Sequence, residues 1–434
     1  MATSILAWLS LALIIIPLSV DNIWSIPIGY YHLKVQYLGA FFAVLLLWVQ
    51  LCSSDTRKLF KKRLAQPDWI PWIAFLFTGA MGALHSVYPS RAVFFLFWAG
   101  ATTGLIPFIL FSLRRALGHW TVERALWGYG FLQSLLLITD ALICMPTEGK
   151  WHLGQVMIYG SGAGRLCRPS AGYQEPGYFC AFMLLLIISA RLGLKKDPKP
   201  WARKLAGLCL TTGLLACIVS TSRLGWLGVL LFSAFEAQSL FFSKEKRAGL
   251  RSFIKKSRAA FVGALALIVI ILGLNAPSIY RHVGKGVLSP THDDSFKYRY
   301  WRLGAALQVF QENIWVGSGP GTAGAYFIDK IDDSDPFKKT IQPAERLFMR
   351  HDPLSMNLYT ELLSEWGVLG LLSFVFFLGL RLWPLPTALR VQIALTLLLV
   401  YLSTPTLARF DLWFVLACLT EVGLGTNKNV KKAG

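Results

Sequence analysis

Charged residues are scarce in this 434-residue chain: they make up 15% of it, and 23 acidic residues face 43 lysines and arginines. Hydrophobic residues make up 55% of the chain, and the mean hydropathy is +0.51. Soluble domains of this length do not have such a composition. The composition therefore excludes an ordinary soluble protein and predicts an integral membrane protein.

Metal-ligand spacing and internal repeats are also absent. Seven cysteines fit no ligand pattern, and most lie in apolar runs, where cysteine packs as a small hydrophobic residue. Cys167 and Cys180 are expected at the outer face and are able to pair in an oxidising compartment, but two free thiols are the favoured interpretation. The lack of a visible repeat disfavours transporters built from duplicated halves.

Apolar stretches of about 17–25 residues, each able to cross a bilayer, recur along the chain. We expect about twelve, beginning near Ser4, Gln36, Trp69, Ala92, Ala125, Gly177, Leu205, Gly225, Ala259, Asn357, Val391 and Leu412. The first has no small-residue cleavage site after it, which favours a retained span over a signal peptide. The predicted fold is an all-α polytopic membrane protein: a single transmembrane domain over 1–434, with one large loop at 277–356.

Lysines and arginines divide unequally between the two sides that these spans create. The loops at 54–68, 113–124, 191–204, 243–258 and 381–390, together with the C-terminal tail, hold 26 of the 43. Short basic loops remain in the cytoplasm, so we expect both termini there and the 277–356 loop outside. Topology and contact with anionic lipid headgroups then explain the net charge of +20 without nucleic acid.

The first unusual outward stretch is "RLCRPSAGYQEPGYF" at 165–179. Arg165 and Arg168 precede Glu175 and Pro176 at the mouth of an apolar run. Proline suits the first turn of a helix, and a carboxylate just before it is stabilised by the helix dipole. A helix cap with an ion-pair partner is the structural alternative to a functional site here.

Two further stretches carry outward arginines. "STSRLGWLG" at 220–228 is a very short connection between two spans and contains Arg223. An unpaired charge at this position is costly. The alternative to a functional role is an arginine that snorkels to the membrane interface as an anchor. "KYRYWRLGAALQVFQENIWVGSGPGTAGAYF" at 297–327 predicts an amphipathic helix outside the bilayer that ends near Asn313. Arg299 and Arg302 lie on its first turn, and the glycines that follow allow close backbone approach.

The fourth stretch is "RLFMRHDPLSMNLYTELLSEWGVLG" at 346–370. Arg350 and His351 precede a span that begins near Asn357. Glu361 and Glu365 lie inside that span, four residues apart on one helical face, where carboxylates usually face protein or a cavity. His351 is a candidate general base because its ordinary pKa is near working pH; a solvated loop histidine is the alternative.

Other acidic residues carry less weight. "DDSD" at 332–335 has the Asp-x-Asp spacing of metal-dependent glycosyltransferases, but it lies on the expected outer side, where nucleotide sugars are not expected. We interpret it as a solvated loop. Asp140 and Glu236 lie inside spans without a spacing that relates them, so they predict no proton pathway. We expect no metal and no cofactor.

The four stretches, in this order, resemble the O-antigen ligase/polymerase superfamily of bacterial membrane glycosyltransferases. "RPSAGYQEP" resembles the family's Arg followed seven residues later by Glu-Pro, and "STSRLGWLG" its Ser-Arg-Gly-type hairpin. "RYWRLGAALQVFQENIWVGSGPG" resembles its Arg-x-Trp helix with a Gly-x-Gly turn. "MNLYTELLSEWGVLG" resembles its His-Asn, nine residues, Gly-x-x-Gly element, with Met356 in place of the ligase histidine. The resemblance begins near residue 125 and favours the polymerase variant.

The resemblance implies a polyprenyl-pyrophosphate-linked oligosaccharide donor, a glycan acceptor and a site on the periplasmic side of the bacterial inner membrane. A chain-length regulator is a further partner. Arg223 and Arg299 would hold the pyrophosphate, with Arg168 assisting or orienting Glu175, and Glu175 or His351 would deprotonate the acceptor. The remaining residues assigned to substrate binding are Arg165, Arg302, Arg350 and Asn357.

Three alternatives remain. The first is a ligase that transfers O-antigen to lipid A core or to protein. The second is a lipid-linked sugar transporter, which predicts charges near the middle of the membrane and on both sides. The third is a membrane anchor or assembly protein without catalytic activity, which does not explain the presence of four charged stretches.

Overall fold

The computed structural model describes residues 2–19, 25–28, 31–118, 120–144, 151–153, 156–159, 166–171, 173, 176–241, 269, 273, 294–323, 326, 357–403 and 409–430. For residues 2, 19, 25–28, 31–34, 156–159, 166–168, 239–241, 294–302, 403 and 421–430, only the backbone is described. The predicted span near Ala259 therefore lies outside the described residues, apart from two isolated positions. Most of the 277–356 loop does as well.

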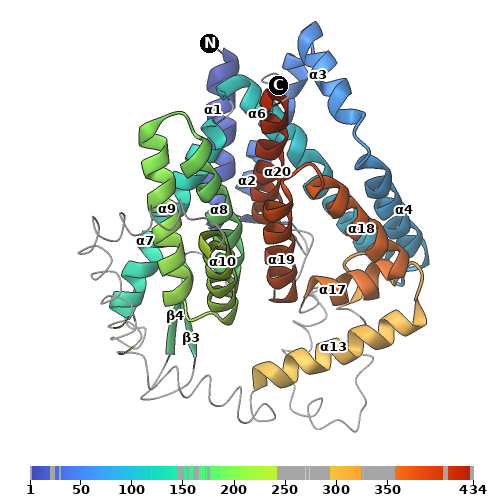
Figure 1. Ribbon diagram of the computed structural model, residues 1–434. Helices are drawn as coiled ribbons and strands as arrows, with labels where there is room; N and C mark the ends of the chain where they lie inside the picture. The colour runs from blue at the N-terminus through green and yellow to red at the C-terminus, as the bar shows by residue number, and fades with distance from the viewer. Residues whose placement is uncertain are drawn as a thin grey trace.

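The described chain is a bundle of helices (Figure 1). Its first half contains α1 (Ala2–Ile15), η1 (Ile16–Ser19), β1 (Ser25–Ile28), β2 (Tyr31–Lys34), α2 (Val35–Gln50), α3 (Ser54–Leu64), α4 (Trp69–His85), α5 (Pro89–Gly100), η2 (Ala101–Leu105), α6 (Ile106–Leu117), α7 (Thr121–Cys144), β3 (Val156–Tyr159) and β4 (Leu166–Pro169). Its second half contains α8 (Pro176–Lys196), α9 (Pro200–Val219), α10 (Arg223–Phe241), α13 (Asp294–Glu312), α17 (Leu358–Glu361), η4 (Leu362–Trp366), α18 (Gly367–Leu382), α19 (Thr387–Ser403) and α20 (Phe410–Val430). The segments η2 and η4 are π-helical turns within longer helices.

Helices long and apolar enough to cross a membrane account for five segments of the described chain, or six if the bent pair α2–α3 is one span. The five are Pro89–Leu117, Thr121–Cys144, Pro176–Lys196, Pro200–Val219 and Leu358–Leu382. Shorter apolar helices lie at Thr3–Leu18, Trp69–His85, Thr387–Leu402 and Phe410–Thr420. The chain is thus a polytopic helical membrane protein, while the number of twelve spans stays a prediction.

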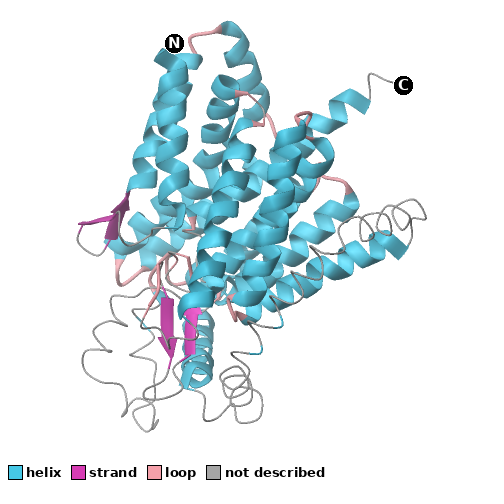
Figure 2. Ribbon diagram, turned by 90° about the vertical axis from the view of Figure 1, so that its left-hand side faces the viewer, coloured by secondary structure: helices cyan, strands magenta, loops and turns pink. Residues whose placement is uncertain are grey.

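Two short antiparallel hairpins modify the all-α expectation. β1 pairs with β2, and β3 pairs with β4, with Met157 opposite Arg168. Both hairpins lie outside the helical bundle, and β3–β4 is at the end away from the N-terminus (Figure 2). Runs of four residues between spans carry too little periodicity to be predicted as strands.

The central helix is α8, whose side chains are buried almost throughout. Helices α7, α9, α10, α19 and α20 all pack against it. Glycines permit the close approach: a Cβ on Gly193 would lie 2.1 Å from the Trp127 ring, and one on Gly228 would lie 2.2 Å from Leu184. Small residues at such crossings are typical of helix packing in membranes.

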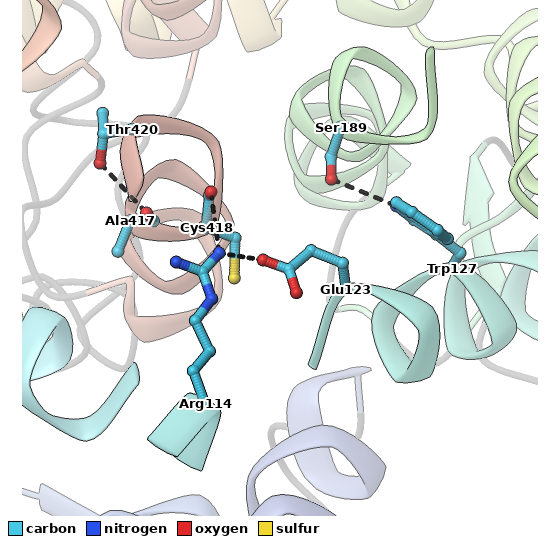
Figure 3. Close-up of polar contacts among 7 residues, drawn as sticks. All are labelled: Arg114, Glu123, Trp127, Ser189, Ala417, Cys418 and Thr420. Atoms are coloured by element: carbon cyan, nitrogen blue, oxygen red, sulfur yellow. Dashed lines mark hydrogen bonds and ion pairs between the residues drawn. The ribbon is translucent and has the colours of Figure 1, made fainter. Parts of the chain in front are cut away.

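Buried charges in the described bundle are paired between helices. Figure 3 shows Arg114 of α6 between the Glu123 carboxylate of α7 and the Cys418 carbonyl of α20, to which it donates at 3.2 Å. Arg191 of α8 pairs with Glu236 of α10, and Asp140 accepts a hydrogen bond from the backbone N–H of Leu153. These contacts give Asp140 and Glu236 structural roles.

Asp197, just beyond the end of α8, anchors the turn to α9. Arg124 donates to both its carboxylate oxygens, at 2.9 and 2.7 Å, and the backbone N–H of Lys199 donates at 2.9 Å. Burial opposes ionisation, but the hydrogen bonds and charges of Arg124 and Lys199 hold the pKa of Asp197 below its usual value. The carboxylate is therefore charged at neutral pH and fixes α7 to the α8–α9 turn.

The two ends of the bundle differ in charge. The N-terminus, the basic helix α3, the α6–α7 and α8–α9 turns and the C-terminal end of α20 lie at one end (Figure 1). We call it the basic end. The hairpin β3–β4, the α9–α10 turn, α13 and α17 lie at the opposite end, which we call the mouth end.

Candidate functional site

The α9–α10 turn holds the second motif in a strained, tightly bonded form. Ser220 donates to the Cys217 carbonyl at 2.8 Å and accepts from the backbone N–H of Ser222 at 3.3 Å. Thr221 has a φ of 54°, which is uncommon for a β-branched residue and persists only where the surroundings enforce it. Arg223 follows as the first residue of α10 and is exposed. The turn therefore fixes the position of the Arg223 backbone, from which the side chain extends.

The first motif lies beside this turn. A Cβ on Gly177, in the first turn of α8, would lie 3.8 Å from the Ser222 hydroxyl. The helix begins at Pro176, as the sequence predicts. Before it, Ala171 has a φ of 51°, and Tyr173 is fully buried among aromatic rings, 6.0 Å from that of Phe179.

An arginine that sequence reasoning missed joins these elements. Arg409, one residue before α20, donates to both carboxylate oxygens of Asp411 and to the Tyr178 carbonyl at 3.5 Å. Its guanidinium carbon lies 5.6 Å from the ring centroid of Tyr173 and 4.7 Å from that of Tyr178. A cation over two aromatic faces is attracted by both, so Arg409 ties α20 to the first motif.

The same corner reaches the fourth motif. Helix α19, which carries Tyr401 with 3% of its surface exposed, packs against both α17 and α8. Glu361, in the short helix α17, is 6% exposed. The fourth motif therefore faces the corner that holds the first. In the sequence, Arg409 could have been noticed only as a charged residue at the start of the last apolar run.

The glycine-rich turn after α13 contacts protein along its backbone. The N–H of Ser318 donates to the Ser364 carbonyl at 2.9 Å, and that of Gly319 donates to the Glu365 carbonyl at 3.0 Å. A Cβ on Gly317 would lie 2.2 Å from the Glu365 carbonyl carbon. The close approach that the sequence predicts is thus an approach to η4, and π-helical turns supply free carbonyls of this kind.

Glu365 completes this junction. Its carboxylate is 1% exposed and accepts from the backbone N–H groups of Gly321 at 2.6 Å and Ala323 at 3.2 Å. Arg91, on the first turn of α5, adds a favourable charge. Glu361 and Glu365 also line one small pocket. The prediction that both face protein or a cavity is confirmed, and the contacts of Glu365 make it an anchor of the turn.

Asn357 is the N-cap of α17. Its side-chain oxygen accepts from the Thr360 N–H at 2.9 Å, which satisfies one of the unpaired donors of the helix. The predicted helix over the third motif is present as α13, ending at Glu312, and buries Ala305 and Val309. It lies across the mouth end of the bundle (Figure 1) and packs against η4 and α17.

The remaining predicted site residues are only partly visible. Arg168 lies on β4. Arg299 and Arg302 lie on α13, but this helix begins at Asp294, so the prediction that both lie on its first turn is wrong. Only the backbone of these three residues is described. The residues outside the described part of the chain are Arg165, Glu175, Arg350 and His351. Their roles, and those of Arg223 and Asn357 in binding, stay predictions.

The cysteines bear on one expectation. Cys180 is buried and forms no disulfide, and its Sγ lies 3.1 Å from the Ser220 hydroxyl, so pairing with Cys167 is excluded. Cys144, the last residue of α7, is disulfide-bonded. The other cysteines whose side chains are described are not disulfide-bonded, so its partner lies outside that part of the chain. The favoured expectation, that Cys180 forms no disulfide, is confirmed, and the side chain of Cys167 lies outside the described residues.

Comparison with known proteins identifies the second half of this architecture. The family model described as O-antigen ligase matches residues 208–375, which run from α9 into α18 and contain the second, third and fourth motifs. No curated protein matches the chain. The match confirms the resemblance seen in the motifs, and residues 208–375 of this chain are thus similar to the O-antigen ligase family.

Proposed function

We propose that this protein polymerises polyprenyl-pyrophosphate-linked oligosaccharide repeat units at the periplasmic face of the bacterial inner membrane, for O-antigen, capsule or exopolysaccharide. The family match supports a membrane glycosyltransferase. The observation that carries the proposal is that described parts of all four motifs gather at the mouth end, away from the basic loops. A lipid-borne phosphate and a water-borne sugar meet at such a membrane boundary.

The charge asymmetry supports the orientation that this function needs. Short basic loops remain in the cytoplasm, so the basic end is cytoplasmic and the mouth end is periplasmic in the proposal. The disulfide at Cys144, at the mouth end of α7, points the same way because disulfides persist in oxidising compartments.

Cys52 provides a direct test of this orientation. It is the exposed free thiol of the described chain and lies between α2 and α3, at the basic end. We expect a membrane-impermeant maleimide to label it only after the inner membrane is permeabilised. Cys52→Ser should remove that labelling. Labelling of Cys52 in cells with only the outer membrane opened would reverse the proposed topology.

The proposed chemistry uses fixed arginines to stabilise a leaving pyrophosphate. Arg223, at the start of α10, and Arg299, on α13, bind its oxygens; arginine remains protonated and donates in a bidentate fork. Arg168, Arg302 and the other nearby arginines add positive charge. Preorganised donors of this type are aimed at charge that develops in the transition state.

The reaction balances as a direct displacement. The acceptor hydroxyl oxygen forms a bond to the anomeric carbon, the bond from that carbon to the phosphate oxygen breaks, and the lipid pyrophosphate leaves with its electron pair. Glu175 or His351 takes the hydroxyl proton. This path inverts the anomeric centre. Asn357, the N-cap of α17, binds the acceptor in this proposal.

A ligase is the second candidate, because the matching family model is described as O-antigen ligase. In that case the acceptor is lipid A core or a protein instead of another repeat unit. Met356, where the ligase pattern has histidine, favours the polymerase.

The surface glycan of a deletion strain tests the proposal. For a polymerase we expect single repeat units on lipid A core, with the ladder restored by the wild-type gene. Long chains that accumulate on the polyprenyl carrier, with none on the core, would assign the ligase reaction. An unchanged glycan in the deletion strain would contradict both the polymerase and the ligase proposal.

A further inference from the structure

A pocket opens at the basic end, far from the four motifs. It lies where the α3–α4 corner meets the end of α18 and the side of α20, and its volume is about 160 Å³. Since about 10–15 Å³ of space measured in this way holds one water molecule, the pocket has room for a phosphate-sized group. The proposed glycan chemistry makes no use of it.

Positive charge predominates among the described side chains that line this pocket. Arg63 and Arg381 line the pocket together with one carboxylate, that of Asp68, and Arg63 donates to the side-chain oxygen of Gln66. The Arg381 Nη1 lies 3.7 Å from the Asp68 Oδ2, and the two side chains are 5% and 7% exposed. That distance is an ion pair but is too long for a hydrogen bond, and the Asp68 Oδ1 has no hydrogen-bond partner. The half-buried Arg63, the buried Arg381 and one loosely held carboxylate form a site suited to an anion.

A further arginine stands behind one wall of the pocket. Trp383 lines it, and the guanidinium carbon of Arg390 lies 4.5 Å from the centre of the Trp383 ring. Arg390 also donates to the Trp383 carbonyl at 2.7 Å. Its charge therefore adds to the positive potential of the pocket, and its contacts hold the wall in place.

The surroundings of the pocket are those of a membrane interface. Helix α3 turns from α2 by 119° and exposes basic side chains together with Leu64, which is 47% exposed. Ile70, at the start of α4, is 74% exposed, and Trp383 is 68% exposed. Tryptophan is enriched at the headgroup level, and a basic amphipathic helix lies in the same plane. The pocket thus opens at the depth of lipid headgroups.

We propose that this pocket binds the phosphate of an anionic phospholipid in the leaflet at the basic end. Arg63 and Arg381 donate to the phosphate oxygens, while Asp68 orients Arg381 and opposes part of the anion's charge. Pro67, Leu380 and Pro384, which also line the pocket, contact the glycerol and the first acyl carbons. Basic pockets between membrane helices are known to recognise such headgroups. The lipid then joins the α3–α4 corner to α18 and α20.

Thermal unfolding of the purified full-length protein in detergent tests this site. A ligand that binds only the folded state raises the unfolding midpoint with its concentration. We expect phosphatidylglycerol to do so and phosphatidylcholine not to. Arg63→Gln should raise the half-saturating concentration of phosphatidylglycerol about tenfold, because a charge-assisted contact is lost. Asp68→Asn should lower that concentration, because it removes the opposing negative charge.

Arg57→Gln is the matched control. Arg57 lies on the same helix, is exposed and does not line the pocket, so its replacement should change half-saturation less than about twofold. Equal effects of Arg57→Gln and Arg63→Gln would reduce the interaction to general attraction by α3 and overturn the proposal. Inorganic phosphate that shifts the midpoint as far as the lipid does would assign the pocket to a free anion instead.

Discussion

Arg223→Ala should abolish the long-chain glycan ladder. The residue begins α10 directly after the strained α9–α10 turn, and the proposed site uses its guanidinium to hold the leaving pyrophosphate. Loss of one preorganised donor of this kind lowers turnover about 100-fold or more. A deletion strain that carries this variant should therefore display single repeat units, measured by gel separation of its surface glycan.

Two further variants make the result specific. Arg223→Lys keeps the charge but loses the bidentate fork, so we expect a faint ladder between those of the wild type and the alanine variant. Arg203→Ala removes an exposed arginine near the start of α9, at the basic end, and should leave the ladder intact. If Arg223→Ala reaches the membrane at normal levels and supports a full ladder, the assignment of Arg223 to the pyrophosphate is wrong.

Gly317→Ala should separate the glycine-rich turn from η4. Gly317 has a φ of +71°, and its Cβ would lie 2.2 Å from a backbone carbon of Glu365. Backbone strain together with this overlap should cost about 3 kcal/mol or more of stability. The ladder should be lost as well, because α13 and the fourth motif meet at this junction. The unfolding midpoint in detergent and the glycan ladder measure the two effects.

The control for this variant lies in the preceding helix. Gly304 is within α13, and a Cβ there would meet nothing within 4 Å. Gly304→Ala should therefore be neutral or raise stability by about 0.5–1 kcal/mol, as alanine does in exposed helices. If both alanine variants unfold at the wild-type temperature, the junction with η4 does not hold the turn, and our account of Glu365 as its anchor fails with it.

The membrane helices could be predicted because their signal is local. A helix lies at each predicted start except the one near Ala259, which falls outside the described residues. Hydrophobic length and proline placement need no tertiary information: Pro176 marks the start of α8 as its fixed φ favours. The amphipathic helix over the third motif was predictable for the same reason, since periodicity along the chain records which face is buried.

The candidate site was less predictable because its contacts join distant segments. Arg409 looks like an ordinary residue at the start of a span, and only the packing of α20 against α8 brings it over Tyr173 and Tyr178. The β3–β4 hairpin was missed for a different reason, since four-residue strands carry almost no periodic signal.

The sequence alone determined that this protein is a polytopic membrane protein with a basic end, and that four motifs resembling those of the O-antigen ligase/polymerase superfamily follow one another along the chain. Hydropathy, charge and motif order are properties of single residues and their neighbours. The tertiary structure decided which contacts the described motif residues make. The backbone of the glycine-rich turn after α13 contacts η4, and the Glu365 carboxylate accepts hydrogen bonds from the N–H groups of Gly321 and Ala323. The physical reason is that a buried backbone group must find a partner, and its position depends on how the helices pack.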